Sequence, residues 1–248
     1  MNVFIIGGTS GIGLALASFY QQKGHRVGVC GRDLSKLSTE LPFEKYEADV
    51  IDKELLTSVI HQFINSSALS LLINCAGSYA EDVAGEISYD QAVAMLQTNI
   101  IGAINTLEIG REVMQYSGGQ IVLLASISGI LDYPESSLYT KTKRSVLQIA
   151  DAYRRALRPF GIHITTIAPG YVATKKLHEL NQNNLSKKPF LVSEAQAVAE
   201  ISHAIAQKKP IHLFPTRMKW LMCLLSFLPK PLLSLIMYRK AKWMQANN

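Results

Sequence analysis

Short runs of apolar residues alternate with longer amphipathic stretches along most of this chain. The apolar runs are mostly continuous, as expected for strands that are covered on both faces. They predict strands at residues 3–6, 26–30, 43–47, 69–74, 120–125, 162–168 and 211–214. The stretches between them predict helices at residues 12–23, 53–64, 89–114, 136–158 and 193–206. This alternation predicts an α/β fold, a doubly wound parallel sheet of about seven strands with helices on both sides, rather than a mixed α+β fold.

Two segments depart from this alternation. Residues 171–189 are polar and rich in Lys and Asn, and they directly follow a predicted strand, where ligand loops lie in open α/β sheets. Residues 215–248 follow the last predicted strand and are apolar and basic. We therefore expect a single domain over residues 1–214 with a hydrophobic helical extension at residues 215–248.

The composition suits one large core, because 48% of the 248 residues are hydrophobic and 18% are charged. The three cysteines lie far apart and no histidine pair has zinc spacing, so we expect neither a disulfide scaffold nor a metal site. The N-terminal MNVFIIGG lacks the basic region of a secretory signal. A cytoplasmic protein is therefore expected.

The net charge of +6 comes from the C-terminal extension. Eight Lys and Arg residues and no acidic residue follow position 207, whereas residues 1–207 carry 17 basic and 19 acidic side chains. The basic residues of the extension are interleaved with Leu, Met and Phe, so the pattern does not indicate nucleic-acid binding.

The extension contains two short apolar segments. Eleven of the sixteen residues from Leu221 to Ile236 are apolar, and Pro229, Lys230 and Pro231 divide them. An eight-residue helix is only about 12 Å long, against a hydrocarbon core of about 30 Å, so neither segment spans a bilayer. The flanking basic and aromatic residues of 215–243 suit an anionic membrane surface. A lid over the substrate pocket and a subunit interface are the alternatives.

A glycine-rich turn follows the first predicted strand and opens the first predicted helix. Its residues are Gly7, Gly8, Thr9, Ser10, Gly11, Ile12 and Gly13. Glycines allow a tight turn and a close approach of the backbone to a pyrophosphate, and the helix N-terminus adds N–H donors and a dipole that favours anions. Between a strand and a helix, this turn predicts a dinucleotide-binding site.

The end of the second predicted strand bears on the choice of cofactor. An acidic residue there would accept a hydrogen bond from the ribose 2′-hydroxyl of NAD and repel the 2′-phosphate of NADP. The chain has Gly31 at about that place, followed by Arg32, whose guanidinium suits a phosphate. This favours NADP(H) over NAD(H). The alternative is that Arg32 pairs with Asp33, which would then bind the ribose.

Tyr139 and Lys143 lie one helical turn apart, so their side chains share a face. A nearby ammonium favours a phenolate, and we expect Lys143 to lower the pKa of Tyr139 and make it a proton donor and acceptor for an alcohol/ketone pair. Ser126 ends an apolar strand and is placed to hydrogen-bond a substrate oxygen. Asn99 is an amide within an apolar helical pattern and is placed to organise a water behind the pair.

In their order and spacing, these residues resemble the short-chain dehydrogenase/reductase family over residues 1 to about 206. The resemblance rests on GGTSGIG at 7–13, ADV at 48–50, NCAG at 74–77, Asn99, Ser126, YTKTK at 139–143 and PGYVAT at 169–174. It implies a Rossmann-type fold and an NAD(P)-dependent dehydrogenase or reductase. Cys75 departs from the family, which usually has Asn there.

The resemblance also implies individual roles. Tyr139 would be the acid/base, Lys143 would bind the nicotinamide ribose, and Ser126 would orient the carbonyl. Asn99 would hold a proton-relay water. Beyond the glycine turn, the implied cofactor-binding residues are Arg32, Asp49, Val50, Asn74, Ala76, Gly77, Tyr139, Lys143, Pro169, Gly170, Val172 and Thr174. The residues expected to contact the substrate are Ser126, Ile127, Tyr133, Tyr139 and Tyr171.

We therefore expect NADPH-dependent reduction of a hydrophobic ketone or aldehyde, or the reverse oxidation of a secondary alcohol, by hydride transfer with Tyr139 as acid/base. A non-catalytic NADP(H)-binding redox sensor and an NAD-dependent alcohol dehydrogenase are the alternatives. The resemblance further implies a homodimer or homotetramer.

Overall fold

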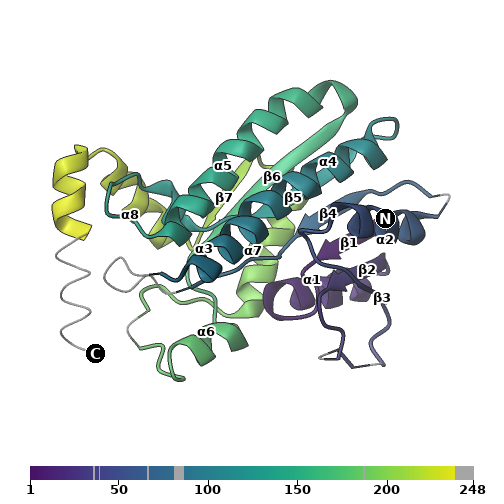
Figure 1. The fold of residues 1–248 in the computed structure, drawn as a ribbon, viewed down its shortest axis with the longest axis horizontal. Helices are drawn as coiled ribbons and strands as arrows, with labels where there is room; N and C mark the ends of the chain where they lie inside the picture. Colours follow the sequence, from purple (N-terminus) through teal and green to yellow (C-terminus); the bar gives the residue numbers. More distant parts are fainter. Residues whose placement is uncertain (36, 39, 66, 81–86, 187, 238–248) are drawn as a thin grey trace.

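Seven strands form one sheet in the order β3-β2-β1-β4-β5-β6-β7 in the computed structural model (Figure 1). The structure describes residues 1–35, 37–38, 40–65, 67–80, 87–186 and 188–237. The strands are β1 Asn2–Ile6, β2 Arg26–Gly31, β3 Glu44–Glu47, β4 Leu71–Asn74, β5 Gly119–Leu124, β6 Ile162–Pro169 and β7 Ile211–Phe214. Every neighbouring pair is parallel, which confirms the predicted doubly wound sheet.

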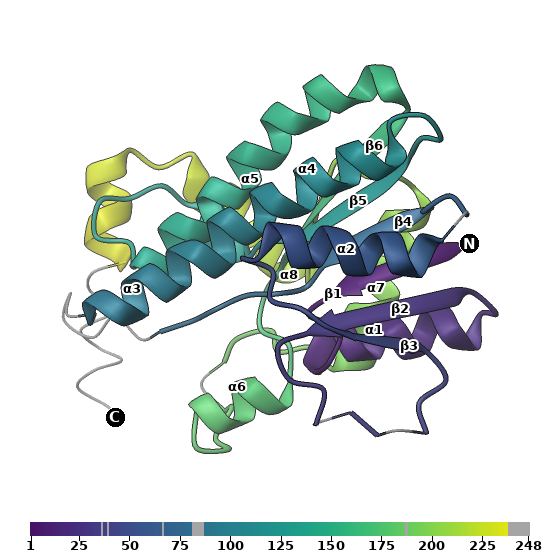
Figure 2. The same cartoon turned by 45° about the vertical axis from the view of Figure 1, so that its right-hand side comes forward.

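Helices cover both faces of the sheet (Figure 2). They are α1 Gly11–Gln22, α2 Lys53–Ile64, α3 Tyr89–Leu96, α4 Gly102–Met114, α5 Leu138–Leu157, α6 Lys175–Leu180, α7 Glu194–Ala206 and α8 Thr216–Ser226. Phe4 and Ile6 belong to a core with α2, α4 and α5, whereas Val3 and Ile5 belong to a core with α1 and α7. Because successive strand side chains point to opposite faces, two buried faces require the continuous apolar runs seen in the sequence.

The chain winds outward in two directions from the centre of the sheet. It passes from β1 to β2 and β3, and then crosses back to β4 on the other side of β1. The carboxyl ends of β1 and β4 adjoin, with Ile6 opposite Asn74. In open α/β sheets, ligands bind outside the carboxyl ends of the strands at such a reversal of strand order.

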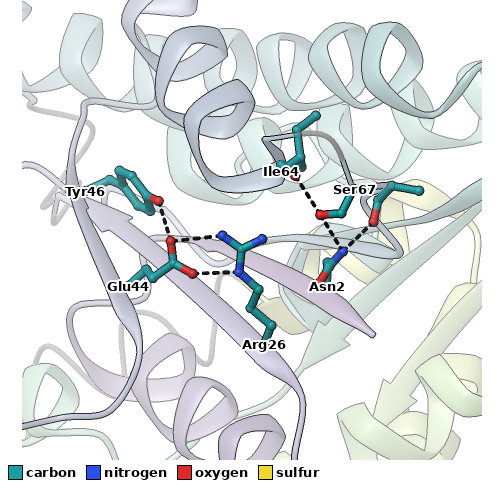
Figure 3. Close-up of polar contacts among 7 residues, drawn as sticks. Asn2, Arg26, Glu44, Tyr46, Ile64 and Ser67 are labelled. Atoms are coloured by element: carbon teal, nitrogen blue, oxygen red, sulfur yellow. Dashed lines mark hydrogen bonds and ion pairs between the residues drawn. The ribbon is translucent and has the colours of Figure 1, made fainter.

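Polar contacts hold the edge strand β3 in place (Figure 3). Glu44 accepts two hydrogen bonds from the Arg26 guanidinium, at 2.7 and 3.2 Å, and one from the Tyr46 hydroxyl at 2.8 Å. Arg26 also lies over the Phe63 ring, with its guanidinium carbon 4.5 Å from the ring centroid. Strand β3, helix α2 and strand β2 are thereby joined on one side of the sheet.

The helix predicted over residues 89–114 contains an irregular turn. Helices α3 and α4 are joined without a break by a π-helical turn, Gln97–Ile101. The predicted irregular segment 171–189 contains the short helix α6, because the Thr174 side chain caps its first turn by accepting from Leu177 N at 3.2 Å. Both departures are local and leave the predicted topology unchanged.

The C-terminal extension lies beside the amino end of α5 (Figures 1 and 2). It contains α8 and a second helical stretch at residues 230–237. Residues 238–248, including the aromatic residues predicted to flank the second apolar segment, lie outside the described residues. None of the helices in the described part of the chain is long and apolar enough to cross a bilayer.

Candidate active site

The glycine-rich turn between β1 and α1 is built by close backbone contacts. Gly7 has a positive φ of 72°, and a Cβ there would lie 2.6 Å from the backbone nitrogen of Ala76. A Cβ on Gly13 would lie only 2.2 Å from the carbonyl oxygen of Gly7. The turn therefore tolerates no side chain at either position, and α1 begins directly against it.

The first turn of α1 suits an anion. Ser10 occupies the N-cap position, but its side chain makes no capping hydrogen bond, and no acidic residue lies in the first turn. The N–H donors and the dipole of this helix end therefore favour a negative group. Thr174 approaches the turn from the end of β6, 3.5 Å from where a Cβ on Gly11 would stand.

Charged groups of both signs lie at the end of β2. The Arg32 side chain is 76% exposed, and its Nε lies 3.9 Å from a carboxylate oxygen of Asp49. Partial burial and then the charge of Arg32 lower the pKa of Lys176, so the two cations are within electrostatic range of each other. Asp33 accepts hydrogen bonds from the backbone and hydroxyl of Ser35, at 2.9 and 2.5 Å.

Gly31 and Val50 are placed by packing in this region. A Cβ on Gly31 would lie 2.7 Å from the Thr9 hydroxyl oxygen, so the glycine brings β2 against the glycine-rich turn. Val50 is buried in the core, and a Cβ on Gly102 would lie 2.8 Å from its methyl groups. Ile12 is partly buried against the other core.

The turn after β4 is held by Asn74. Its amide donates to Thr106 Oγ1 at 2.8 Å and to the Gly102 carbonyl at 3.3 Å, and its oxygen accepts from Ala76 N at 2.8 Å. A Cβ on Gly77 would lie 3.3 Å from Lys143 Nζ. The turn thus passes directly beside the Lys143 ammonium.

Asn99 lies in the π-helical turn and is buried. Its amide donates to the Ser78 carbonyl and to Thr142 Oγ1, both at 3.0 Å, and its oxygen accepts from Ser78 N at 2.9 Å. The side chain therefore ties the segment after β4 to helix α5. A π-helical turn inside an α-helix is a feature often found at functional sites.

Tyr139 and Lys143 stand at the start of α5, whose N-cap Ser137 accepts from Thr140 N at 3.2 Å. Lys143 Nζ donates to the Leu124 carbonyl at 3.0 Å and lies 5.9 Å from the centroid of the Tyr139 ring. Burial lowers the pKa of Lys143 to about 8. The two side chains share a face of the helix, as their spacing predicts.

The sequence predicts that Lys143 lowers the pKa of Tyr139, and for the chain without cofactor this prediction is wrong. Burial raises that pKa to about 12, a hydrogen bond with Ser126 opposes the rise, and the neighbouring Tyr79 and Tyr171 add to it. Desolvation disfavours the charged phenolate more than the surroundings stabilise it. Tyr139 is therefore a protonated phenol at neutral pH. Ser126 itself accepts hydrogen bonds from Ser128, from N at 3.2 Å and from Oγ at 3.0 Å.

Aromatic side chains surround the Tyr139 phenol. The Tyr79 ring meets the Tyr139 ring edge-on, with centroids 5.1 Å apart. Lys188 Nζ lies 5.2 Å from the centroid of the Tyr171 ring. Tyr133 is close enough for Tyr171 to raise its pKa, after the larger effects of burial and Glu135. Ile127 is buried in a 3-10 turn that directly follows Ser126.

The segment after β6 closes the other side of the site. Pro169 ends β6, and Gly170 N donates to the Phe214 carbonyl at 2.8 Å. Val172 is buried and forms a parallel bridge with Val192. These contacts direct the chain back toward the glycine-rich turn.

A small cavity lies behind Lys143. The cavity has a volume of about 10 Å³, and its lining includes Asn74, Asn99, Leu124 and Lys143. This is about the volume that one water molecule needs, and polar groups line it.

Sequence comparison finds a family match and relatives that cover most of the chain. The profile of the short chain dehydrogenase family matches residues 1–185. An uncharacterized oxidoreductase of Staphylococcus aureus strain USA300 is 28% identical over 217 residues, which are 84% of this chain and 92% of that protein. A 3-oxoacyl-[acyl-carrier-protein] reductase of Mus musculus is 25% identical over 207 residues, 81% of this chain and 87% of that protein.

Solved structures share the fold. ElxO with NADP bound has a TM-score of 0.76 at 24% identity, covering 86% of this chain and 96% of its own. A short chain dehydrogenase from Burkholderia cenocepacia J2315 in complex with NADP has a TM-score of 0.79 at 19% identity, covering 91% of this chain and 92% of its own. Both neighbours hold a nicotinamide dinucleotide.

Four residues around the site are absent from the sequence-based expectations. Ser78 and Tyr79 directly follow the NCAG segment, and Thr142 lies between Tyr139 and Lys143. Their position beside or within a motif is the only signal that singles them out. Lys176 belongs to the Lys-rich segment 171–189, but only the folded chain brings it near Arg32.

Proposed function

The chain belongs to the short-chain dehydrogenase family and is an NAD(P)-dependent dehydrogenase/reductase; from this premise we propose that it reduces a hydrophobic ketone or aldehyde with NADPH, with Tyr139 as the proton donor. The observation that carries the proposal is the meeting of Tyr139, Ser126 and Lys143 beside the turn at Gly77. This turn adjoins the glycine-rich turn, so the acid/base pair and the anion-binding helix end lie at one edge of the sheet.

The residues present fit a nicotinamide dinucleotide. The uncapped start of α1 and the side-chain-free positions 7 and 13 form a cradle for a pyrophosphate. Lys143 would bind the nicotinamide ribose, and Val172 and Thr174 would border the carboxamide and phosphates. When bound, NADPH supplies the hydride.

The protein's own residues would handle the substrate oxygen and its proton. Ser126 and Tyr139 would hydrogen-bond the carbonyl oxygen and polarise it. The Tyr139 phenol is protonated at neutral pH, since its ordinary pKa is 10 and burial raises that pKa further, so it carries the proton that the oxygen needs as the alcohol forms. Lys143, as an ammonium, would stabilise the phenolate left behind. A water in the cavity beside Asn99 and Lys143 would return the proton from solvent.

Arg32 and Lys176 support NADP(H) as the cofactor. Arg32 directly follows β2, where a 2′-phosphate would bind, and it is close enough to Lys176 to lower the pKa of that ammonium. Gly31 leaves no acidic side chain at the preceding position. The carboxylate of Asp33 is engaged by Ser35, which makes it a poorer ligand for a ribose hydroxyl. Asp49 and Val50 would border the adenine.

Ile127, Tyr133 and Tyr171 would form apolar walls of the substrate site. Aromatic rings with hydroxyl edges suit a hydrophobic carbonyl compound held by a few polar contacts. The mouse relative is named for a 3-oxoacyl substrate, so a 3-oxoacyl thioester belongs among the compounds to be tried.

The experiment is NADPH oxidation with a panel of hydrophobic ketones, aldehydes and a 3-oxoacyl thioester, repeated with NADH. We expect turnover with NADPH at a kcat/KM well above that with NADH. Binding of NADPH, followed by its fluorescence, serves as the control for a folded cofactor site. NADPH binding without turnover on any carbonyl would favour a redox sensor, and a preference for NADH would favour an NAD-dependent dehydrogenase.

A further inference from the structure

The C-terminal extension presents an apolar face that the described residues do not cover. Trp220 and Leu224 of α8 are 67% and 68% exposed, and Phe227, which caps the end of this helix, is 85% exposed. They recur at the spacing of one helix face. Leu232, Leu235 and Ile236 of the following helical stretch are also exposed. We define these six residues as the tail patch.

The extension is nevertheless docked on the body of the protein. Met218 is buried, and a Cβ on Gly170 would lie 2.6 Å from its sulfur. Leu233 is also buried. The exposed residues of the tail patch are therefore held outward by a fixed helix pair, and their exposure does not come from an undocked segment.

Basic side chains border the tail patch on α8. Arg217 and Lys219 are exposed there, and no acidic residue follows position 207 in the sequence. Among the described residues, two carboxylates from the segment before α5 contact the second helical stretch: Asp132 pairs with Lys230 at 2.8 Å and with Arg144 at 3.6 Å, and Glu135 accepts from the Ser234 hydroxyl. The α8 part of the patch is thus apolar with a basic border.

The apolar surface and its basic border favour one kind of binding partner over another. A second copy of the chain, paired symmetrically through the same patch, would present another basic border and no carboxylate from the extension to pair with Arg217 and Lys219. An anionic bilayer surface accepts the apolar side chains at the depth of the headgroups and pairs with the basic border. Trp220 is an amphipathic ring of the kind that lies at this depth.

We propose that the tail patch binds the surface of a membrane that contains anionic lipid. The helices lie in the interface and do not cross it, in keeping with their length. Lys230 and Ser234 tie this surface to the loop after β5, which also carries Tyr133. If the proposed function is right, this contact brings one expected wall of the substrate site, Tyr133, next to the membrane-binding extension, which suits a carbonyl compound that partitions into lipid.

The test is vesicle flotation of the full chain with phosphatidylcholine vesicles that contain or lack phosphatidylglycerol. We expect binding to the anionic vesicles, weakened by high salt because screening reduces the charge contribution. Trp220→Ser combined with Leu224→Ser should lower the partition coefficient at least about tenfold. Tyr116→Ser is the matched control, because Tyr116 is 95% exposed but lies just before β5, at the opposite edge of the sheet.

Circular dichroism and thermal melting confirm that each variant is folded. A full chain that stays unbound on anionic vesicles overturns the proposal. If the unbound chain is a dimer that the double variant converts to a monomer, the patch belongs to a second copy instead. Equal flotation of the double variant and the wild type also overturns it. Flotation needs no turnover, so failure of the reductase proposal and failure of this one are separate results.

Discussion

Replacing Gly13 with alanine tests the cofactor cradle with a single methyl group. The added Cβ would lie 2.2 Å from the Gly7 carbonyl oxygen and 3.1 Å from Gly8 Cα, and both neighbours are backbone atoms of the turn. Carbon atoms in contact normally stand about 3.5–4.0 Å from their neighbours. The turn or the start of α1 must therefore move by about 1 Å.

Gly13→Ala has two opposing effects on the free energy of unfolding. Overpacking of a close contact costs about 1–3 kcal/mol, and alanine in place of a helical glycine returns up to about 1 kcal/mol. With the full helix gain, we expect a net loss of about 0–2 kcal/mol in the free energy of unfolding. The affinity for NADPH should fall more than the stability. The displaced backbone N–H groups would donate to the pyrophosphate, and a hydrogen bond to a charged group contributes about 1.5–3 kcal/mol. That corresponds to a rise in Kd of about tenfold to a hundredfold.

Fluorescence titration gives the Kd for NADPH, and urea unfolding gives the stability. Gly110→Ala is the matched control: it also adds a methyl group to a helical glycine, 2.4 Å from Ile121 Cδ1, but far from the turn. It should reduce stability and leave the Kd unchanged. If Gly13→Ala binds NADPH as tightly as the wild type, the pyrophosphate does not lie against this turn.

Three further predictions concern the charged and polar groups of the site. Because burial lowers the pKa of Lys143 to about 8, the ammonium is present below that pH and lost above it, so kcat for reduction should fall above about pH 8; a rate that stays flat to pH 10 contradicts this. Arg32→Glu should raise KM for NADPH about tenfold or more with little change for NADH, and equal changes for both cofactors would remove Arg32 from the phosphate site. Asn99→Ala leaves Ser78 and Thr142 without their partner, so urea unfolding should show a loss of about 2 kcal/mol; unchanged stability would mean that these hydrogen bonds do not hold the helix turn.

Much of the fold could be predicted from the sequence because its physical causes are local. Both faces of the sheet are buried, so the central strands are continuous apolar runs such as residues 3–6, and the turns that bind ligands follow the strand ends. The π-helical turn at Gln97–Ile101 was not predictable, since its residues fit an ordinary amphipathic helix. Its geometry depends on contacts of Asn99 with Ser78 and Thr142, which only the folded chain brings together.

The positions of the candidate site residues follow from motif spacing, whereas their electrostatics do not. The one-turn separation of Tyr139 and Lys143 correctly predicts a shared helix face. It does not show that Lys143 donates to the Leu124 carbonyl, or that Tyr79 and Tyr171 crowd the phenol. The pKa of Tyr139 depends on this burial, and the residues that cause it are remote in sequence. The docking of the extension through Lys230 and Asp132 is likewise a tertiary contact without a local signal.

The turnover of Tyr139→Phe tests the proposed function most directly. Phenylalanine keeps the ring that meets Tyr79 and removes only the hydroxyl that would donate the proton. The variant should bind NADPH with the affinity of the wild type and reduce the best ketone of the panel at least about a hundredfold more slowly. Ketone reduction at the wild-type rate, with NADPH binding intact, would show that this phenol is not the proton donor.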